Sequence, residues 1–401
     1  MHAIRAAVAY DGERFLDDGA TVLVEDSTIA GVEPLAFDLP EVCPVTAYAG
    51  TLLPGLFDCH VHLVADSTPG GLERAATYDE AAVDAVIVRS LRQQAAAGVT
   101  TVRDLGDVGF RTLHHRDHPV DGLPRILAAG PPLTTPGGHC HFLGGVAEGE
   151  RAIRSATDER ADRGVDIVKV MASGGMLTPG SDQLGVQFTF DDLCLLVSCA
   201  HDRGLAVLAH THSLAGAEHA VAAGVDGLEH FTCLARGGVA PPGGLIDEIV
   251  EHGVVVDMTL GLDQAVLDQM GGPPPSIRLV MAELGLDPDT LYERRLTNVA
   301  TLREHGVRVV TGVDSGASPV KPHGSAWRAV GDLVRGGYSP AAALATATSG
   351  AAGVCGLGDR TGRLAGGYDA DLLVVDGDLR SDIEALGRPV SVHVRGRRVV
   401  P

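Results

Sequence analysis

Two histidines at the end of an apolar run are the most informative residues of the sequence. His60 and His62 are separated by one residue and follow the apolar run 51–57. Because side chains alternate across a β-strand, these two imidazoles point to one side, and Cys59 and Val61 point to the other. Two imidazoles on one face can bind a divalent metal ion. Since the chain contains 17 histidines, the pair alone is weak evidence for a metal site.

Four further residues with metal-binding chemistry lie in strand-like runs. The runs 165–170, 205–210, 225–230 and 307–314 contain Lys169, His210, His230 and Asp314, in that order. Similar runs occur at 99–104, 125–129 and 254–258, and the run that ends near His62 brings the expected number of strands to eight.

Helical patterns separate most of these runs. They cover 78–97, 148–163, 189–203 and 291–305, and several are followed by a glycine just before the next strand. Eight alternating units over roughly 300 residues predict a (β/α)8 barrel. Because the carboxyl ends of barrel strands share one rim, where active sites form, the candidate ligands are expected to meet there.

Both ends of the chain show a different pattern. Short alternating runs separated by turn residues occupy 4–49, with a hairpin-like turn at 17–19, and such runs recur at 366–376 and 390–400. Neither end is long enough to bury a core alone, so we expect them to pair in one small β-sandwich. The predicted domains are residues 1–53 and 353–401, which share the β-sandwich, and residues 54–352, which form a distorted barrel.

Composition and charge limit the class of partner. The formal net charge of −21, from 31 basic and 52 acidic residues, leaves no basic stripe for phosphates. We therefore expect a small-molecule substrate and no nucleic acid. No apolar run approaches a membrane span, and the first residues lack a signal-peptide pattern, so we expect a cytoplasmic protein without a membrane partner. The seven cysteines include no Cys-x-x-Cys pair and are expected to be reduced.

The order of these motifs resembles the amidohydrolase superfamily. The matching segments are His60-Val61-His62, 168–175, His210, 227–230, 311–314 and the closing stretch 362–375. The resemblance extends over nearly the whole chain. Within the superfamily, the segments 169–180, 210–212 and 321–324 are most similar to the prolidase-like and imidazolonepropionase-related branch.

The resemblance implies a metal-dependent hydrolase that cleaves an amide-type C–N bond in a dipeptide, an N-acyl amino acid or a related amide or carbamate. It implies two divalent metal ions, with a bridging hydroxide as the nucleophile. Imidazole and carboxylate ligands favour zinc and leave manganese and iron open. The implied metal ligands are His60, His62, Lys169, His210, His230 and Asp314. Lys169 would ligate after carboxylation by carbon dioxide, because an ammonium group cannot. Asp314 would carry the proton to the leaving nitrogen, and we expect a homo-oligomer.

Other histidines have weaker assignments. His212 shares a strand face with His210 and competes with it as a ligand; we favour His210 and expect His212 to contact the substrate. The resemblance also makes His139, in the glycine-rich loop after the third strand, a substrate-side residue. His323 is an even choice between substrate contact and helix capping. The histidines in 114–118 are expected in a solvated polar loop, and 271–276 in a surface connection over the barrel mouth.

Two alternative functions stay open. One is a mononuclear cyclic-amide hydrolase or deaminase that uses His60, His62, His210 and Asp314 without the lysine. The other is a non-catalytic barrel that binds a metal or ligand, although all six ligand positions hold suitable residues, which argues against a decayed site. The sequence contains no Gly-x-Ser-x-Gly elbow and no Walker loop.

Overall fold

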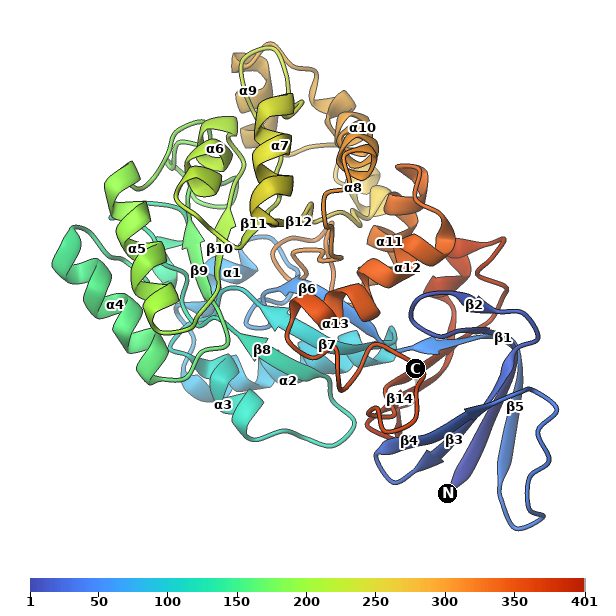
Figure 1. Cartoon of the computed structure of the whole chain (residues 1–401). Helices are drawn as coiled ribbons and strands as arrows, with labels where there is room; N and C mark the ends of the chain where they lie inside the picture. The colour runs from blue at the N-terminus through green and yellow to red at the C-terminus, as the bar shows by residue number, and fades with distance from the viewer. Residues whose placement is uncertain (400–401) are drawn as a thin grey trace.

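The computed structural model describes residues 1–399, which form a barrel of parallel strands and a flanking mixed sheet (Figure 1). Residues 400 and 401, including the last position of the predicted run 390–400, lie outside the described residues. The predicted α/β class, with a (β/α)8 barrel and a β domain built from both termini, is confirmed. The domain boundaries near residues 53 and 353 stay predictions.

The barrel wall consists of parallel strands that lie side by side, with their carboxyl ends at one rim. One group pairs in the order β6-β7-β8 and the other in the order β12-β11-β10-β9. The bridge from Leu133 to Val170 joins the two groups. The strand bounds are β6 Leu56–Val61, β7 Val99–Asp104, β8 Arg125–Ala128, β9 Val168–Met171, β10 Val207–His210, β11 Gly227–Glu229 and β12 Val255–Asp257.

The eighth position of the barrel is filled by an extended segment, residues 307–315, that is not a regular strand. It bridges to β12 through Val256 and Val309, and to β6 through Val61 and Ser315. The Asp58 carboxylate holds this segment, because it accepts hydrogen bonds from Val313 N at 3.0 Å and Ser315 Oγ at 2.7 Å. The sequence thus predicted the position of the eighth strand correctly. Part of its expected backbone hydrogen-bond ladder is replaced by contacts with the Asp58 side chain.

Helices cover the outside of the barrel (Figure 1). α2 shows why they form: Asp79 caps its N-terminus by accepting from Ala82 N at 2.8 Å, and Val83, Ile87 and Leu91 lie four residues apart on its buried face. The four predicted helices are confirmed as α2 Glu80–Ala96, α4 Glu150–Asp162, α5 Phe190–Asp202 and α10 Leu291–Glu304. The other helices are α1 Gly71–Ala75, α3 Arg111–Asp117, α6 Leu214–Ala222, α7 Gly243–His252, α8 Gln264–Gln269, α9 Pro275–Glu283, α11 Ala326–Arg335, α12 Pro340–Thr346 and α13 Ser349–Val354.

The two ends of the chain pair in one mixed sheet, in the order β15-β14-β13-β5-β1-β3-β4, with β2 beside β1. The sheet curls, and its edge strand β4 also contacts the segment before β13, because Ile29 N donates to Tyr368 O and Gly367 N donates to Ile29 O, both at 2.8 Å. A separate core, which includes Ile4, Val22 and Leu372, fills the curl. The strands are β1 His2–Tyr10, β2 Phe15–Leu16, β3 Ala20–Glu25, β4 Thr28–Glu33, β5 Val45–Pro54, β13 Leu372–Val375, β14 Pro389–Val394 and β15 Arg397–Val399.

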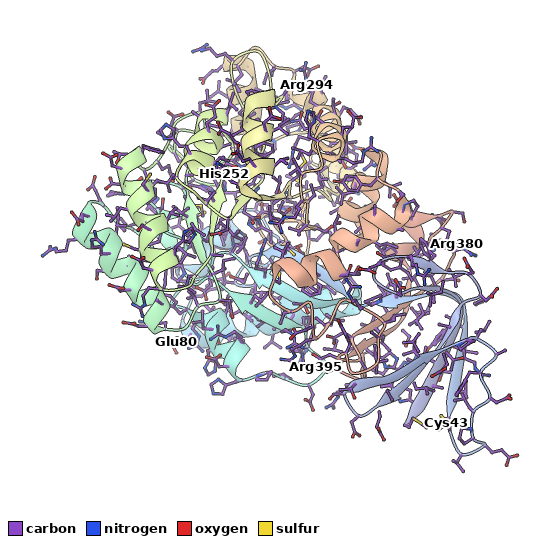
Figure 2. The ribbon with its side chains drawn as sticks, in the orientation of Figure 1. Cys43, Glu80, His252, Arg294, Arg380 and Arg395 are labelled. Atoms are coloured by element: carbon purple, nitrogen blue, oxygen red, sulfur yellow. The ribbon has the colours of Figure 1, made fainter. Side chains whose placement is uncertain are left out.

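This sheet contacts the barrel directly. Arg395, labelled in Figure 2, follows β14 and donates through Nη2 to Leu123 O at 3.2 Å, in the loop before β8. Leu373 and Val392 of the sheet belong to the main barrel core. Within residues 1–399, no helix is both long and apolar enough to cross a membrane.

Two local predictions were wrong. The chain reverses at Asp11–Arg14 rather than at 17–19, because the Asp11 carboxylate accepts from Glu13 N and Arg14 N, both at 2.8 Å. The histidines of 114–118 lie mostly in helix α3, whose first turn is held by Asp107, the acceptor for Thr112 N at 2.8 Å. The predicted surface connection at 271–276 leads into α9, which packs on a small apolar cluster with Leu234.

Candidate metal centre

The first group of candidate ligands joins β6 to the eighth segment. His62 Nε2 lies 3.2 Å from Asp314 Oδ1, and His60 Nε2 lies 3.6 Å from the same oxygen. One ligand atom from each of the three residues lies within 4.8 Å of the others. Two imidazoles and one carboxylate at this spacing are suited to a divalent cation.

The second group lies beside the first and consists of imidazoles only. His210, His212 and His230, from the ends of β10 and β11, also offer ligand atoms within 4.8 Å of one another. The ring of His230 is 5.0 Å from that of His60 and 4.5 Å from that of His210, measured between centroids. The structure therefore brings together the four histidines and the aspartate predicted from the sequence.

The ring orientation of His60 is set by a residue that sequence reasoning missed. The His60 Nδ1–H donates to Glu229 Oε2 at 2.6 Å, which leaves Nε2 free to bind a metal. Arg103 fixes Glu229 in turn, since Nη2 lies 3.2 Å from Oε1 and Nε donates to Cys59 O at 2.8 Å. The sequence signal that could have revealed this role is a glutamate in the strand-like run 225–230, directly before a predicted ligand.

The other ligand rings are also held by one nitrogen. His62 Nδ1–H donates to Gly106 O at 2.9 Å, and His230 Nδ1 lies 2.9 Å from Thr259 Oγ1. His210 is held the opposite way, because its Nε2–H donates to Gly174 O at 3.2 Å and leaves Nδ1 free. The other nitrogen of each ring is therefore the one that can bind a metal.

Lys169 lies on β9 among these groups and is 1% exposed. Its Nζ is buried without a hydrogen-bond partner in the described part of the chain. Burial lowers the pKa of Lys169 to about 8, against the opposing effect of Glu229 and Asp314. A buried ammonium without a partner is costly, whereas the neutral amine can react with carbon dioxide. The orphaned amine therefore fits a carboxylated lysine, and the donor set as a whole fits two divalent metal ions.

Burial favours the neutral form of three of the four ligand imidazoles, the form that binds a metal. It lowers the pKa values of His60, His210 and His230 well below the usual range, and neighbouring imidazoles or Lys169 add to the shift. Burial also opposes protonation of His62, but its hydrogen bond to Asp314 raises the pKa of that ring. Burial raises the pKa of Asp314, but Lys321 and the two histidines outweigh it, so the carboxylate stays ionised.

Two candidate ligands have an unusual backbone. His230 has φ 69° and Asp314 has φ 68°, in the left-handed region that few residues other than glycine adopt. Such a conformation costs on the order of 1 kcal/mol or more and is concentrated at functional sites. At His230 it ends β11 abruptly, so that both Glu229 and His230 reach His60.

The three predicted substrate-side histidines differ in their surroundings. His139 lies against His210, with ring centroids 4.5 Å apart, and its Nδ1 lies 2.9 Å from Thr178 Oγ1. His212 is half-buried and stacks on His230 at 4.6 Å. His323 has both nitrogens in contact with the protein, because Nε2 donates to Ala65 O at 2.9 Å and Nδ1 lies 3.4 Å from Gln94 Nε2. This geometry favours a structural role for His323.

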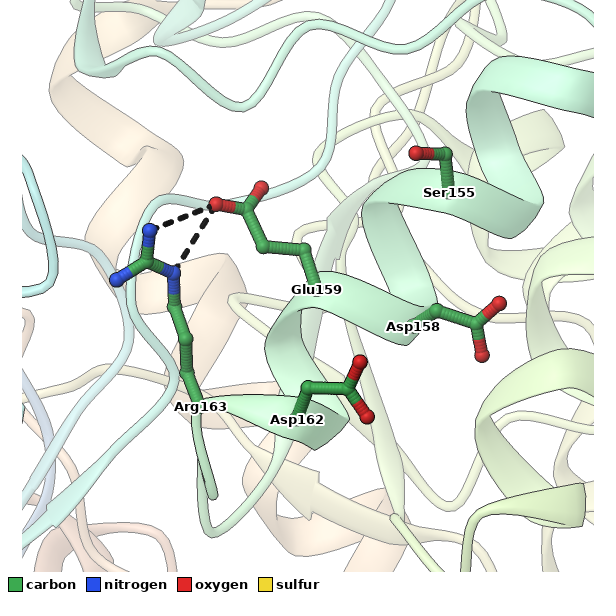
Figure 3. A pocket seen from close by; sticks show the side chains of 5 residues that line it. All are labelled: Ser155, Asp158, Glu159, Asp162 and Arg163. Atoms are coloured by element: carbon green, nitrogen blue, oxygen red, sulfur yellow. Dashed lines mark hydrogen bonds and ion pairs between the residues drawn. The ribbon is translucent and has the colours of Figure 1, made fainter.

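A hollow elsewhere on the surface lies on the outside of helix α4 (Figure 3). Its lining includes the ion pair of Arg163 and Glu159, whose side chains lie 3.0 Å apart. The other lining residues are Ser155, Asp158 and Asp162. These residues lie on the face opposite the buried Ile153 and Thr157, so the hollow is outside the barrel and separate from the candidate metal centre.

The model of the amidohydrolase family matches residues 51–399, which is most of the chain and includes every candidate ligand. The chain belongs to the amidohydrolase family. This membership confirms the predicted enzyme class, a hydrolase that acts on C–N bonds. It also confirms the resemblance on which the ligand assignment rests.

Individual amidohydrolases resemble the chain along almost its full length. It is 26% identical to an ochratoxinase of Aspergillus niger, over 97% of this chain and 85% of that protein. It is 25% identical to an imidazolonepropionase of Cereibacter sphaeroides, over 98% and 97% of the two chains. The structure of a Xaa-Pro dipeptidase with bound methionine in the active site superposes with a TM-score of 0.84, at 24% identity and 99% coverage of both chains. The prolidase-like and imidazolonepropionase-related placement is thus confirmed.

Proposed function

We propose that the protein is a binuclear metal-dependent hydrolase that cleaves an amide-type C–N bond in a dipeptide, an N-acyl amino acid or a related small amide or carbamate. The observation that carries this proposal is the buried, unpartnered Nζ of Lys169, which lies among four imidazoles and a carboxylate. A mononuclear hydrolase or deaminase has no use for such an amine.

The proposal assigns the ligands between two divalent ions, with zinc as the expected metal. His60, His62 and Asp314 would hold one ion, and His210 and His230 the other, with carboxylated Lys169 shared between them. When bound, the ions polarise the scissile carbonyl and supply hydroxide near neutral pH. His212 is the alternative to His210, because its Nε2 is free while Nδ1 lies 2.9 Å from Thr232 Oγ1.

Residues of the chain would then orient the substrate and move the proton. Asp314 is ionised and can accept the nucleophile's proton and deliver it to the leaving nitrogen. His139 is buried beside His210, and burial lowers its pKa to about 3, so it is a neutral ring able to contact the substrate carbonyl. His212, half-buried beside His230, would contact the substrate from the side of β10.

The activity is tested by a panel of dipeptides, N-acyl amino acids, carbamates and cyclic amides, incubated with protein loaded with zinc and bicarbonate. Release of the amine product from one of these classes supports the proposal. Deamination or ring opening with a single metal per chain would instead support the mononuclear alternative. Metal binding without turnover of any compound would support a non-catalytic barrel.

Lys169→Ala tests the role of the orphaned amine. The variant should lose most of its activity and part of its metal, and short carboxylic acids in the medium should restore part of both by occupying the place of the lysine carboxylate. Lys169→Arg is the matched variant that keeps the charge but cannot be carboxylated, and it should not be active. Full activity of either variant would make Lys169 a structural residue.

A further inference from the structure

Arg295, on helix α10, places its guanidinium at the carboxyl ends of β11 and β12. Its Nη2 donates to the carbonyl of His230 at 3.3 Å and to the carbonyl of Met258. Its Nε is buried without an acceptor, and no carboxylate within residues 1–399 forms an ion pair with it. The guanidinium thus lies next to the backbone of a candidate metal ligand while its charge is uncompensated.

A second cation, Lys321, lies next to the same stretch of backbone. Its Nζ donates to Thr259 O at 3.0 Å and lies 3.6 Å from Asp314 Oδ2. Arg295 and Lys321 therefore contact the successive carbonyls of Met258 and Thr259. His212, which is half-buried, stacks on His230 at this side of the centre.

The nearby acids do not neutralise this pair of cations. Asp332 already pairs with Arg335 and accepts from Gly261 N at 2.9 Å. Asp257 accepts from Thr259 N at 2.7 Å and, within residues 1–399, forms no ion pair with either cation. Asp314 is the counter-ion of Lys321, but the proposed function makes it a metal ligand, so its charge is shared with the ions.

Hydrogen bonds to carbonyls explain only part of this arrangement. A lysine or a neutral donor could satisfy the carbonyls of His230 and Met258, whereas an arginine brings a permanent charge and further donors. Arg295 and Lys321 are half-buried, and a counter-ion offsets the hydration that such a charge loses. Within residues 1–399, Asp314 is the partner of Lys321 and no carboxylate forms an ion pair with Arg295, so an anion from outside the chain would complete the pairing.

We propose that Arg295 and Lys321 form a subsite that binds a carboxylate of the substrate, on the side of the metal centre formed by β11, β12 and the eighth segment. The inference rests on the proposed function and narrows its substrate class. It selects N-acyl amino acids and dipeptides with a free carboxylate next to the cleaved C–N bond. Uncharged amides, carbamates and cyclic amides would leave Arg295 without a counter-ion and should react less well.

The test compares N-acetyl-L-leucine with N-acetyl-3-methylbutylamine, which differs from it only by lacking the carboxylate. Acetate release gives kcat/KM for each compound, and calorimetry of the zinc-loaded protein gives binding without turnover. Wild-type protein should prefer N-acetyl-L-leucine in both measurements. In Arg295→Met the preference should fall roughly 10- to 100-fold, mainly through KM, since a charge-assisted hydrogen bond is lost.

Two further variants control for general damage. Arg295→Lys keeps a positive charge and should keep part of the preference. Arg294→Met removes the neighbouring arginine of the same helix, which is exposed and donates to Thr290 Oγ1 at 3.1 Å (Figure 2), and the preference should be unchanged. Because the preference is a ratio measured on one protein, partial unfolding does not change it.

The outcomes separate this subsite from the proposed function. In one outcome, wild-type protein binds N-acetyl-L-leucine without hydrolysing any amide, and Arg295→Met abolishes that binding. This result would support the subsite and contradict the proposed function. If amides are hydrolysed but Arg295→Met retains the wild-type preference, the function stands and the subsite is overturned. Equal binding of both compounds by wild-type protein overturns the subsite as well.

Discussion

The two halves of the candidate metal centre use different chemistry to hold their imidazoles. In the half formed by β6 and the eighth segment, His60 donates to the Glu229 carboxylate and Asp314 adds a second negative charge. In the half formed by β10 and β11, His210 and His230 are held only by a carbonyl and a hydroxyl. A divalent ion in the first half would therefore be held by a charged ligand and a charged supporting group, whereas one in the second half would be held by neutral groups.

This difference gives Lys169 a particular importance. If carboxylated, Lys169 would bring negative charge to the second half, whose three imidazoles are held by uncharged groups within residues 1–399. The first half retains Asp314 without it. We therefore expect the half formed by β10 and β11 to bind its metal more weakly and to lose it first when Lys169 is altered.

The largest effect is expected from removing the charge of the first half. Asp314→Asn keeps the size of the side chain and one oxygen but cannot accept a proton, so kcat should fall by roughly 100-fold or more. Metal content, measured by atomic emission, should change little because five other ligands remain. Turnover within a few fold of wild type would move the proton transfer to another residue, with His139 or His212 as the candidates. Loss of metal would make Asp314 mainly a ligand.

A comparison of His210→Asn with His212→Asn identifies the ligand on β10. Loss of the true ligand should release the metal of the second half and lower activity by roughly 10- to 100-fold or more, whereas loss of a substrate contact should raise KM at full metal content. We expect the first result for His210 and the second for His212. The reverse pattern would exchange the two roles.

Removing the charge that supports His60 should have a smaller effect. Glu229→Gln keeps a hydrogen-bond acceptor for His60 Nδ1 but loses the charge that faces Arg103. Zinc affinity of the first half, measured by competition with a chelator, should fall roughly tenfold, at the lower end of the range for such supporting groups. Unchanged affinity would mean that Glu229 only neutralises Arg103.

The smallest effect is expected from the corresponding neutral support in the second half. Thr259→Val removes the hydroxyl next to His230 Nδ1 at nearly constant volume. The loss of one neutral hydrogen bond is worth about 1 kcal/mol, or several fold in zinc affinity. If Thr259→Val weakened zinc binding more than Glu229→Gln, the proposed contrast between the two halves would be wrong.

The sequence predicted the residues at the carboxyl ends of the barrel strands well, because strand positions follow from local sequence patterns. Strand-like runs and the order of the motifs placed His60, His210 and Asp314 at strand ends, and the structure brings them together. Glu229 was missed because strand alternation points it away from His230. The left-handed backbone at His230 breaks that alternation, and no local sequence pattern predicts this conformation.

Other features depend on contacts between distant segments. Arg295 reaches the centre from helix α10, and it contacts residues 37 and 65 positions away along the chain. The eighth strand was expected to be regular, but the buried Asp58 carboxylate and the left-handed Asp314 replace part of its ladder. Such contacts follow from packing in three dimensions, which periodicity does not encode.

The most direct test of the account is a count of bound metal against activity. Metal-free protein should be titrated with zinc in the presence of bicarbonate while bound zinc and amide hydrolysis are measured on the same samples. The proposed binuclear centre should bind two zinc ions per chain in two steps of different affinity, with activity rising on the second step. A stable value of one zinc ion per chain at full activity would contradict it.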